Sequence, residues 1–310
     1  MSIVTLTMNP AIDIAASAEH IRPTDKIRCA APRFDPGGGG INVARTIGAL
    51  GEPVTAVFPA GGPSGALLEQ LVADADVPAR PVRVAGATRE SLAVTDTGTG
   101  EQFRFVFPGP RLTAPEVHRC LAELERAAAG ARLVVASGSL PPGVPDDFYQ
   151  TVSDLLADLN IGFVLDASGA PLRAMRRGVR VLKPSVRELG EYVGHPLPDS
   201  ETRLAAVREV IAAGVAEAVV LSLGVEGALV ATADGEEWFA PVEVVVRSGI
   251  GAGDAMVGGL CVGLVRGYAL GDAVRLGLAS AAAALETPGT RPGHPARIME
   301  RFRAAARARV

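Results

Sequence analysis

The sequence predicts an α/β fold in which helices cover both faces of a mostly parallel sheet. Segments rich in β-branched residues alternate with segments of helical periodicity along most of the 310 residues. The strand segments are apolar on both faces, as in "ARLVVASGSL" (131–140) and "EAVVLSLG" (217–224), which is typical of parallel strands buried between helices. No internal repeat or low-complexity linker interrupts the chain, so we expect a single domain over 1–310.

The predicted elements follow in order along the chain. A strand at 2–8 ends at Asn9-Pro10, and a helix at 41–51 places Ile41, Ile47 and other apolar residues at helical spacing. The remaining strand–helix pairs are expected at 53–62 and 64–76, 131–140 and 145–160, 162–168 and 170–178, and 179–185 and 186–194. A further strand is expected at 217–224, and a loop followed by a helix within 247–267.

Two stretches interrupt this alternation. Residues 11–35 hold short polar-alternating pieces, and 88–108 have the pattern of two strands around the turn "TGTG". We expect them to form a small antiparallel β-sheet, called the lid below, that stands off the main domain. Phe103, Phe105 and Phe107 share one face of it, and that face requires a cover: substrate, a second copy of the chain, or simple packing on the parent domain.

Charge and cysteine content disfavour several functional classes. The net charge of −4 and the pI of about 5.7 disfavour an electrostatic nucleic-acid binder. Cys29, Cys120 and Cys261 are odd in number and far apart, so they indicate neither a disulfide framework nor a zinc site. The N-terminus has no signal-peptide pattern, and the alanine-rich run 278–285 is too short to span a membrane. We therefore expect a cytoplasmic protein with no nucleic-acid or membrane partner.

The first glycine-rich stretch is "DPGGGGINVAR" (35–45). Four glycines lead into a helix, and without Cβ atoms their backbone N–H groups can approach a ligand closely. The helix presents its positive end at the same place, and Asn42 in its first turn can both donate to and accept from a hydroxyl. A tight strand–helix turn would use the same glycines for structural reasons alone.

The second stretch is "GIGAGDAM" (249–256), which precedes a long apolar helix. Gly251, Ala252 and Gly253 would place successive N–H groups in a concave nest that binds anions. Asp254 lies in the first helical turn, where the macrodipole favours its ionised form. A carboxylate beside an anion nest suits phosphoryl transfer to an alcohol, with Asp254 as the proton acceptor. Capping of its own helix is the structural alternative for Asp254.

Two further loops, "LKPSVREL" (182–189) and "LSLGVEGAL" (221–229), follow predicted strands and should meet at one sheet edge. Lys183 could contact a polyphosphate, and Glu188 could hold Mg²⁺ through water. Gly224 and Gly227 would leave room for a base or phosphate, although ordinary strand–helix loops explain the pattern equally well. Both a P-loop and a dinucleotide-binding fingerprint are absent from the sequence, which disfavours a P-loop enzyme and a Rossmann dehydrogenase.

Together these motifs resemble the PfkB/ribokinase family of sugar kinases. "PGGGGINVAR" resembles its N-terminal motif and "GIGAGDAMVGG" its C-terminal motif, and the resemblance covers essentially the whole chain. "TLTMNPAIDIAAS", "EQFRFVFPG" and "SGSLPPGV" are most similar to the ATP-dependent 6-phosphofructokinase branch. This implies a three-layer ribokinase-like fold and phosphorylation of fructose 6-phosphate at its 1-hydroxyl to fructose 1,6-bisphosphate, with ATP and Mg²⁺.

The resemblance also implies a role for each matching position. Asp254 would be the catalytic base, and the amides of Gly251, Ala252 and Gly253 the anion hole. The sugar hydroxyls would contact Asp13, Gly38, Gly39 and Asn42. The sugar phosphate would lie among Lys26, Arg89, Arg104 and Ser139, and the nucleotide would contact Lys183, Ser185, Ser222, Gly224 and Gly227. Glu188 would act on Mg²⁺, and K⁺ would bind near Ser248, Ile250, Ala284, Thr287, Gly289 and Arg291.

One departure from the family pattern affects the nucleotide site. The chain has serine at Ser185 where this branch usually has asparagine, and serine is shorter with a single donor. Lys26 and Lys183 are the only lysines among 30 basic residues, and both fall in phosphate sites that the resemblance implies. We further expect a homodimer formed through the aromatic face of the lid.

Several alternatives remain open at this level. The enzyme could be a 1-phosphofructokinase or a tagatose-6-phosphate kinase, since these have similar motifs. It could act on an unphosphorylated sugar or nucleoside, in which case Arg89, Arg104 and Lys26 need not converge. A non-catalytic sugar or nucleotide sensor on the same scaffold is a third possibility, which the intact Asp254 and its nest disfavour.

Overall fold

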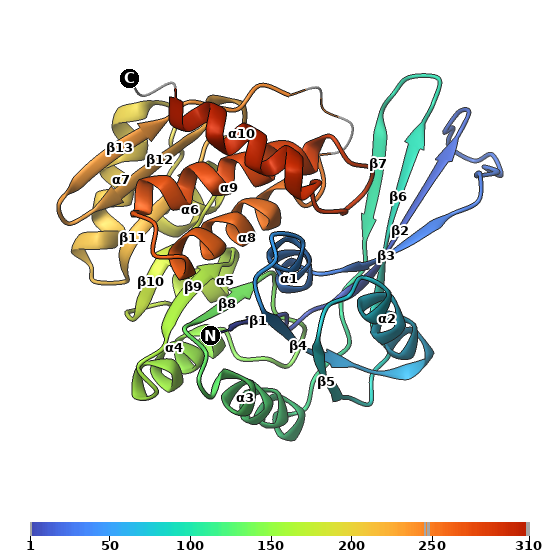
Figure 1. The fold of residues 1–310 in the computed structure, drawn as a ribbon. Coiled ribbons are helices and arrows are strands. Elements are labelled where there is room, and N and C mark those ends of the chain that lie inside the picture. Colours follow the sequence, from blue (N-terminus) through green and yellow to red (C-terminus); the bar gives the residue numbers. More distant parts are fainter. Residues whose placement is uncertain (1, 245, 247–248, 308–310) are drawn as a thin grey trace.

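A nine-stranded, mostly parallel sheet lies at the centre of the computed structural model, which describes residues 2–244, 246 and 249–307 (Figure 1). Only β12 and β13, at one edge, run antiparallel to their neighbours. Within the described residues, the strand order is β13 (Gly235–Phe239), β12 (Ala228–Thr232), β11 (Ala216–Ser222), β10 (Val179–Leu182), β9 (Gly162–Asp166), β8 (Leu133–Ser137), β1 (Ile3–Leu6), β4 (Val54–Ala60) and β5 (Ala79–Arg83). The predicted mostly parallel sheet is confirmed.

Helices cover both faces of this sheet and so form three layers (Figure 1). One face carries α1 (Gly39–Ala49), α2 (Gly62–Asp74), α8 (Ala252–Val265), α9 (Leu270–Leu285) and α10 (Pro295–Arg307). The other carries α3 (Ala114–Ala128), α4 (Phe148–Asp158), α5 (Gly169–Arg173), α6 (Val186–Val193) and α7 (Ser200–Ala212). No helix among the described residues is both long enough and apolar enough to cross a bilayer.

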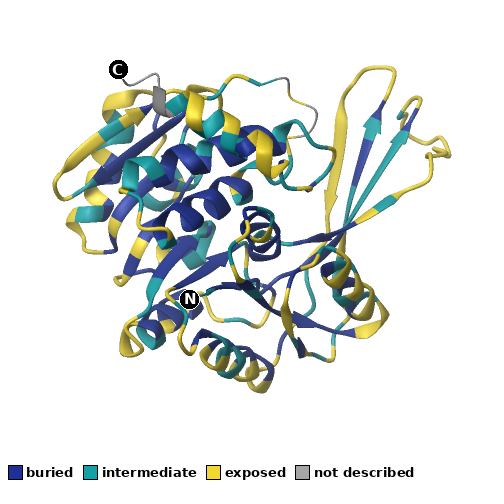
Figure 2. Cartoon of the chain, in the orientation of Figure 1, coloured by how far each residue is buried: buried dark blue, intermediate teal, exposed yellow. Residues whose placement is uncertain are grey.

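The sheet separates two hydrophobic clusters, one against each helical layer. Ile3 packs with Ile41 and Val257 in one cluster, whereas its neighbour Val4 packs with Leu124 in the other. Successive side chains of a strand point to opposite faces, so a strand buried on both faces is mostly apolar along its whole length. Figure 2 shows the central strands buried between helices whose outer surfaces are exposed.

Two helices differ in extent from the sequence prediction. α1 begins at Gly39, two residues before the predicted start at 41, because the glycine run itself enters the first turn. α5 ends at Arg173, although the periodic pattern extends to 178. There the side chain of Gln150 accepts hydrogen bonds from the backbone N–H groups of Arg176 and Arg177, at 2.8 and 3.2 Å, in place of helical carbonyls.

The lid is a four-stranded sheet in the order β3 (Arg33–Gly37), β2 (Ala11–Ala18), β6 (Arg89–Asp96) and β7 (Gln102–Val106), and it projects away from the main domain (Figure 1). Its two outer pairs are antiparallel, as expected, but the central pair β2–β6 is parallel. Both central strands leave the main domain in the same direction, and β3 and β7 return, which explains this arrangement.

Candidate active site

The carboxyl ends of β8, β9 and β10 place polar side chains at one edge of the sheet. Ser137 ends β8, Asp166 ends β9, and Lys183 follows β10. Lys183 Nζ lies 3.0 Å from Asp166 Oδ1, and the two side chains are only 6% and 14% exposed. Ligands of open α/β sheets gather at this edge, so the ion pair marks the floor of a candidate site.

Asp254 joins this floor from the first turn of α8. Its Oδ2 accepts a hydrogen bond from Asn42 Nδ2 at 3.0 Å, and its Oδ1 lies 3.3 Å from the hydroxyl of Ser137. Asn42 lies in the first turn of α1, directly after the four glycines. The two glycine-rich turns, which are far apart in the sequence, therefore meet at one carboxylate.

The protonation equilibrium of Asp254 is shifted towards neutral pH. Burial, together with the nearby charge of Asp166, raises its pKa to about 7. The hydrogen bond from Asn42 and the charge of Lys183 lower it, but by less. The helix dipole alone predicts a stably ionised carboxylate; in the structure burial outweighs that effect. A carboxylate with a pKa near neutrality is suited to accept a proton and release it again.

The start of α8 offers unpaired backbone amides beside Asp254. Gly251, with φ of +79°, is the N-cap residue, and the first bond of the helix runs from Ala255 N–H to the carbonyl of Gly251. The preceding N–H groups, those of Ala252 and Gly253 among them, thus have no partner within the helix. A Cβ atom built on Gly253 would lie 3.8 Å from Lys183 Nζ. The start of α8 and the ammonium group of Lys183 are therefore close to each other, an arrangement that suits an anion.

The glycines of the four-glycine turn are closely packed against neighbouring groups. A Cβ atom at Gly37 would lie 2.4 Å from the carboxyl group of Asp13, and one at Gly39 would lie 2.2 Å from Ser137 Oγ. Gly38 has φ of +108°, which other residues rarely adopt. The missing side chains thus let Asp13 and Ser137 approach the turn, so close packing is one reason for these glycines, and contact of Gly38 and Gly39 with a sugar stays a prediction.

Asp13 and two arginines meet on one face of the lid. Burial raises the pKa of Asp13 to about 6, while the charges of Arg89 and Arg104 lower it. Asp13 and Arg104 line a shallow pocket that also contacts Thr290 of the main domain. Two cationic side chains therefore surround a carboxylate next to the four-glycine turn, an arrangement that suits a ligand with both hydroxyl and phosphate groups.

Asn9 connects Arg89 of the lid to the loop after β8 through hydrogen bonds. Its carbonyl accepts two hydrogen bonds from the guanidinium of Arg89, at 3.0 and 3.3 Å, and Arg89 also donates to the carbonyl of Phe107 at 3.1 Å. The side-chain amide of Asn9 donates to Ser139 Oγ at 3.0 Å. Asn9 therefore links Arg89 to Ser139, two positions that the resemblance assigns to the sugar phosphate.

Lys26 does not belong to this group within one chain. It lies exposed in the loop between β2 and β3, beyond the end of β2 at Ala18. Ala11, at the other end of β2, pairs with Arg89. An eight-residue strand spans about 23 Å between its end residues, so Lys26 lies at the far end of the lid from Arg89. The expected convergence of Lys26 with the other phosphate residues is therefore absent from the single chain.

Ser185 and Glu188 form the N-terminal cap of α6. Glu188 accepts a hydrogen bond from Ser185 N–H at 2.8 Å, and Ser185 Oγ accepts from Glu188 N–H at 3.3 Å. The hydroxyl that replaces the family's asparagine is therefore engaged in the cap. Glu188 nevertheless lines a pocket of about 200 Å³ together with Asp166 and Asp254.

Carboxylate oxygens are the ligands that Mg²⁺ prefers, and three carboxylates line this pocket. Among the described residues there is no cluster of three or more His, Cys, Asp or Glu residues that could hold a metal by side chains alone. Mg²⁺ commonly keeps several waters and binds substrate phosphates, so the donor set suits an ion held partly by Glu188 through water.

The predicted nucleotide loops meet beside this pocket. Ser222 Oγ donates to the carbonyl of Pro184 at 3.2 Å, which joins the loop after β11 to the loop after β10. Gly224, with φ of +60°, begins a short 3₁₀ helix, η1 (Gly224–Glu226). Gly227 differs from the prediction: a Cβ atom there would lie 1.9 Å from the carbonyl oxygen of Phe239. Its missing side chain is required by backbone packing, and contact of Gly227 with a nucleotide stays a prediction.

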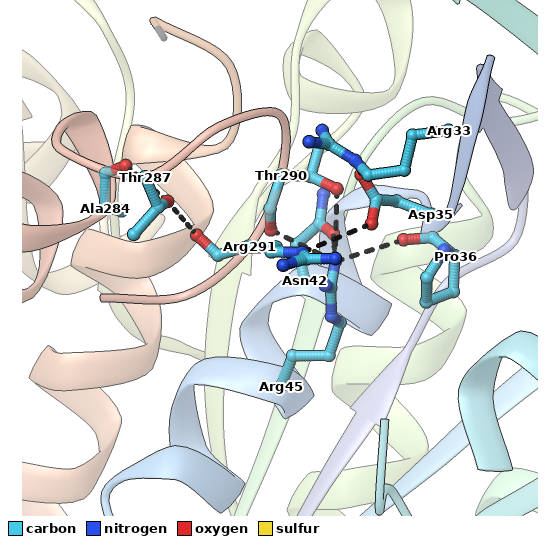
Figure 3. A network of polar contacts seen from close by, with 9 residues as sticks. All are labelled: Arg33, Asp35, Pro36, Asn42, Arg45, Ala284, Thr287, Thr290 and Arg291. Atoms are coloured by element: carbon cyan, nitrogen blue, oxygen red, sulfur yellow. Dashed lines mark hydrogen bonds and ion pairs between the residues drawn. The ribbon is translucent and has the colours of Figure 1, made fainter. Parts of the chain in front are cut away.

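The positions expected to hold a monovalent cation lie around the loop after α9 (Figure 3). The hydroxyl of Thr287 lies 2.8 Å from the carbonyl of Ala284 and 2.6 Å from that of Arg291, which closes the loop on itself. Gly289 has φ of +67°, and a Cβ atom there would strike the guanidinium of Arg33. Ile250 lines the shallow pocket of the lid with Gly289, whereas Ser248 lies outside the described residues.

Four residues of the site were not anticipated: Asn9, Arg45, Ser137 and Asp166. Ser137 and Asp166 each end a predicted parallel strand, so their position at the carboxyl edge was the available signal. Asn9 and Arg45 act through contacts with distant segments, which no local pattern reveals.

A carboxylate, the N-terminus of a helix and a lysine at the carboxyl edge, next to a lid that bears two arginines, are features that suit a sugar kinase. The chain belongs to the pfkB family of carbohydrate kinases, and the model of this family matches residues 5–297. This confirms the predicted family and class of enzyme.

The chain is 54% identical to ATP-dependent 6-phosphofructokinase isozyme 2 of Mycobacterium tuberculosis over 288 residues. The aligned region covers 93% of this chain and 85% of that protein. Phosphofructokinase-2 of Escherichia coli has a similar structure. Its potassium complex superposes with a TM-score of 0.94 at 37% identity, and its fructose-6-phosphate complex with 0.91 at 36%; each covers 98% of this chain and 99% of the other. Arabidopsis thaliana ribokinase, with ribose and ATP, shares the fold at 18% identity, with a TM-score of 0.77 over 97% and 98% of the two chains.

Proposed function

We propose that this protein transfers the γ-phosphoryl group of ATP to the 1-hydroxyl of fructose 6-phosphate. The observation that carries the proposal is the placement of Asp254 against Asn42, next to the open amides of α8. Arg89 and Arg104 beside Asp13 support a phosphorylated sugar over an unphosphorylated one, because a guanidinium fork matches a phosphate group. The names of the relatives support fructose 6-phosphate as the substrate.

The chemical step follows from the positions of these groups. The sugar hydroxyl gives its proton to Asp254 as its oxygen forms a bond to the γ-phosphorus, and the bond from that phosphorus to the bridging oxygen of ADP breaks. The amides of Ala252 and Gly253 and the ammonium of Lys183 stabilise the negative charge on the transferring phosphoryl oxygens. Asn42 holds the carboxylate in place while it accepts the proton.

Mg²⁺ and K⁺ are further parts of the proposal. Glu188, which lines the pocket, would hold Mg²⁺ through water, and the ion would neutralise charge on the ATP phosphates. Removal of Mg²⁺ should abolish turnover. K⁺ would bind at the loop of Ala284, Thr287 and Arg291, and replacing it with tetramethylammonium should lower activity while leaving the melting temperature nearly unchanged.

The lid is proposed to form a homodimer. Strand register places Phe34, Phe103 and Phe105 on the lid face opposite Asp13, and these rings are 37–49% exposed in the single chain. A second lid would cover this apolar face. The dimer also offers a position for Lys26, whose loop at the end of one lid would reach the sugar-phosphate region of the partner subunit.

A substrate panel tests the reaction. Fructose 6-phosphate, tagatose 6-phosphate, fructose 1-phosphate and ribose are each supplied with Mg·ATP, and ADP release is measured. The expected result is the highest kcat/KM with fructose 6-phosphate and a fructose 1,6-bisphosphate product. A preference for fructose 1-phosphate or tagatose 6-phosphate would assign the chain to those kinases, and no ADP release with any sugar would point to a sensor.

The lid proposal has a separate test. Phe105→Glu should convert the dimer to a monomer in sedimentation velocity and raise KM for the sugar phosphate, because Lys26 of the partner subunit is then lost. Glu101→Gln, at the exposed lid turn and away from the aromatic face, is the matched control. A wild-type monomer, or a dimer that survives Phe105→Glu, contradicts the lid interface.

A further inference from the structure

Arg45 is a buried arginine that contacts three separate segments of the protein. It lies on α1 one turn after Asn42 and is 7% exposed. Its NH1 nitrogen lies 3.0 Å from the carbonyl oxygen of Thr290 and 3.1 Å from the Thr290 hydroxyl. The same nitrogen lies 3.4 Å from the Pro36 carbonyl and 3.4 Å from Asn42 Oδ1 (Figure 3).

The contact between Arg45 and Asn42 bears on which way the side-chain amide of Asn42 points. The two ends of an asparagine amide have nearly the same shape, so their neighbours decide which end is oxygen and which is nitrogen. A guanidinium can only donate hydrogen bonds, so the amide oxygen must face Arg45. The amide nitrogen then faces Asp254 and donates to it at 3.0 Å.

Burying the guanidinium group of Arg45 is energetically unfavourable compared with burying an apolar side chain. Removing a charge from water is unfavourable unless acids and hydrogen-bond acceptors compensate it. The charges of Asp35 and Asp13 act on Arg45, and Asp35 itself pairs with Arg33 at 2.8 Å. Methionine or leucine would pack against the same helices at lower cost, so a role in packing alone does not explain an arginine here.

We propose that Arg45 is a positioning residue that fixes the direction of the Asn42 amide, so that Asn42 donates to the general base Asp254. The inference rests on the proposed kinase reaction. Without Arg45 the amide is free to invert and to present its oxygen to the carboxylate, which removes the hydrogen bond and repels the base. Arg45 touches neither the sugar nor the nucleotide in this mechanism, so it acts on kcat through Asn42.

A double-mutant cycle measures this dependence. Arg45→Met keeps a side chain of similar length but has no donor, and we expect kcat to fall about 10- to 100-fold while KM for ATP is unchanged. Arg45→Lys retains a cationic donor and should recover part of the lost kcat. In an Asn42→Ala background, Arg45→Met should lower kcat by no more than about twofold, because the residue through which it acts is already gone.

The matched control is Arg266, the C-cap residue of α8, which contacts the opposite end of α1. Arg266 donates to the carbonyl of Leu50 and to Glu52 Oε1, each at 2.7 Å, and so anchors the C-terminal end of α1 as Arg45 anchors its first turns. Arg266→Met should lower the melting temperature with kcat unchanged. Equal losses of kcat from Arg45→Met in the wild-type and Asn42→Ala backgrounds would overturn the proposal, since the effect would then bypass Asn42.

A spectroscopic measurement keeps the inference independent of turnover. The chain contains three asparagines, Asn9, Asn42 and Asn160, so selective labelling gives three side-chain amide pairs in a ¹⁵N spectrum. Asn42→Ala identifies the Asn42 pair, whose proton bonded to the carboxylate should move upfield in Arg45→Met but not in Arg266→Met. An unmoved pair in Arg45→Met rejects the positioning role even if the kinase turns over, whereas a moved pair supports it even if the substrate is a different sugar.

Discussion

The two glycine-rich turns of this protein have similar compositions but opposite surroundings. At the first turn, Cβ atoms built on Gly37 and Gly39 would lie 2.2–2.4 Å from other side chains. At the second, one on Gly251 would meet its nearest atom at 3.7 Å, and one on Gly253 at 3.8 Å. The first turn is crowded and the second is open.

The difference teaches that glycine serves two distinct purposes at helix N-termini. In the crowded turn it lets strands, Asp13 and Ser137 pack directly on the backbone, so it organises the site. In the open turn the glycines leave space next to Lys183, where we propose that the transferring phosphoryl group binds. Substitutions in the first turn should therefore affect folding, and those in the second should affect chemistry.

The largest expected effect comes from Asp254→Asn in the open turn. Loss of the general base should lower kcat by roughly 10²- to 10⁴-fold, with little change in sugar affinity, measured by steady-state kinetics and calorimetry. Its folded-state pKa of about 7 exceeds the unfolded value of 3.8, so the charged carboxylate costs stability above neutral pH. The variant should therefore melt at a higher temperature than wild type at pH 8. Near-normal turnover would remove Asp254 as the base.

Gly39→Ala should have the next largest effect, and the effect is on folding. The added methyl group overlaps Ser137 Oγ and the backbone behind it, which costs at least about 1–3 kcal/mol of stability. Thermal denaturation and soluble yield measure the change. A protein of wild-type stability would contradict the crowded packing of the first turn.

The pH dependence of activity tests the second turn, through the raised pKa of Asp254, without any mutation. Asp254 must be ionised to accept a proton, so kcat/KM, which reports the ligand-free enzyme, should fall about tenfold for each pH unit below its pKa of about 7. The stability contribution of this group has the opposite sign, since the folded state binds the proton more tightly and gains stability as pH falls from 7 towards 4. A flat kcat/KM between pH 5 and 8 in a protein that stays folded would contradict the raised pKa.

Gly253→Ala should lower activity moderately without unfolding the protein. The methyl group meets only Lys183 Nζ, at 3.8 Å, so the melting temperature should change by no more than a few degrees. It enters the space assigned to the phosphoryl oxygens, and kcat should fall about tenfold. Unchanged kcat would place the transferred group elsewhere.

Gly249→Ala should have the smallest effect. A Cβ atom there meets no atom of the described residues within 4 Å, and the residue does not require a positive φ. Stability should change by less than about 0.5 kcal/mol in chemical denaturation, and kcat should stay within twofold. A strongly destabilised Gly249→Ala would show that the second turn is also crowded.

Much of the architecture could be predicted because the strands are apolar on both faces and the helices are periodic. The carboxyl-edge rule correctly placed the loops of Lys183 and Ser222 side by side. The parallel pairing of β2 with β6 was not predictable, because it depends on the directions in which two distant segments leave the domain. The end of α5 was missed because a side chain, Gln150, takes over its backbone partners.

The site was predicted less completely, for physical reasons. Motifs located Asp254 and Asn42, but the pKa of Asp254 depends on burial and on Asp166, which is distant in the sequence. The sequence suggests that Gly227 leaves room for a ligand, but it does not reveal that the carbonyl group of Phe239 packs against this glycine. Lys26 matched the family pattern, yet a long strand separates it from Arg89 in one chain.

β2 pairs continuously with β6, from Ala11 with Arg89 to Ala18 with Asp96. This register keeps Asp13 on one face of the lid and the exposed aromatic rings on the other. A slip of one residue would exchange the two sides, turning Asp13 outward and an isoleucine inward. Insertions or deletions of a single residue in these strands would therefore damage ligand discrimination and the apolar surface together. Natural variation in the lid should be confined to substitutions and to changes at its far loops.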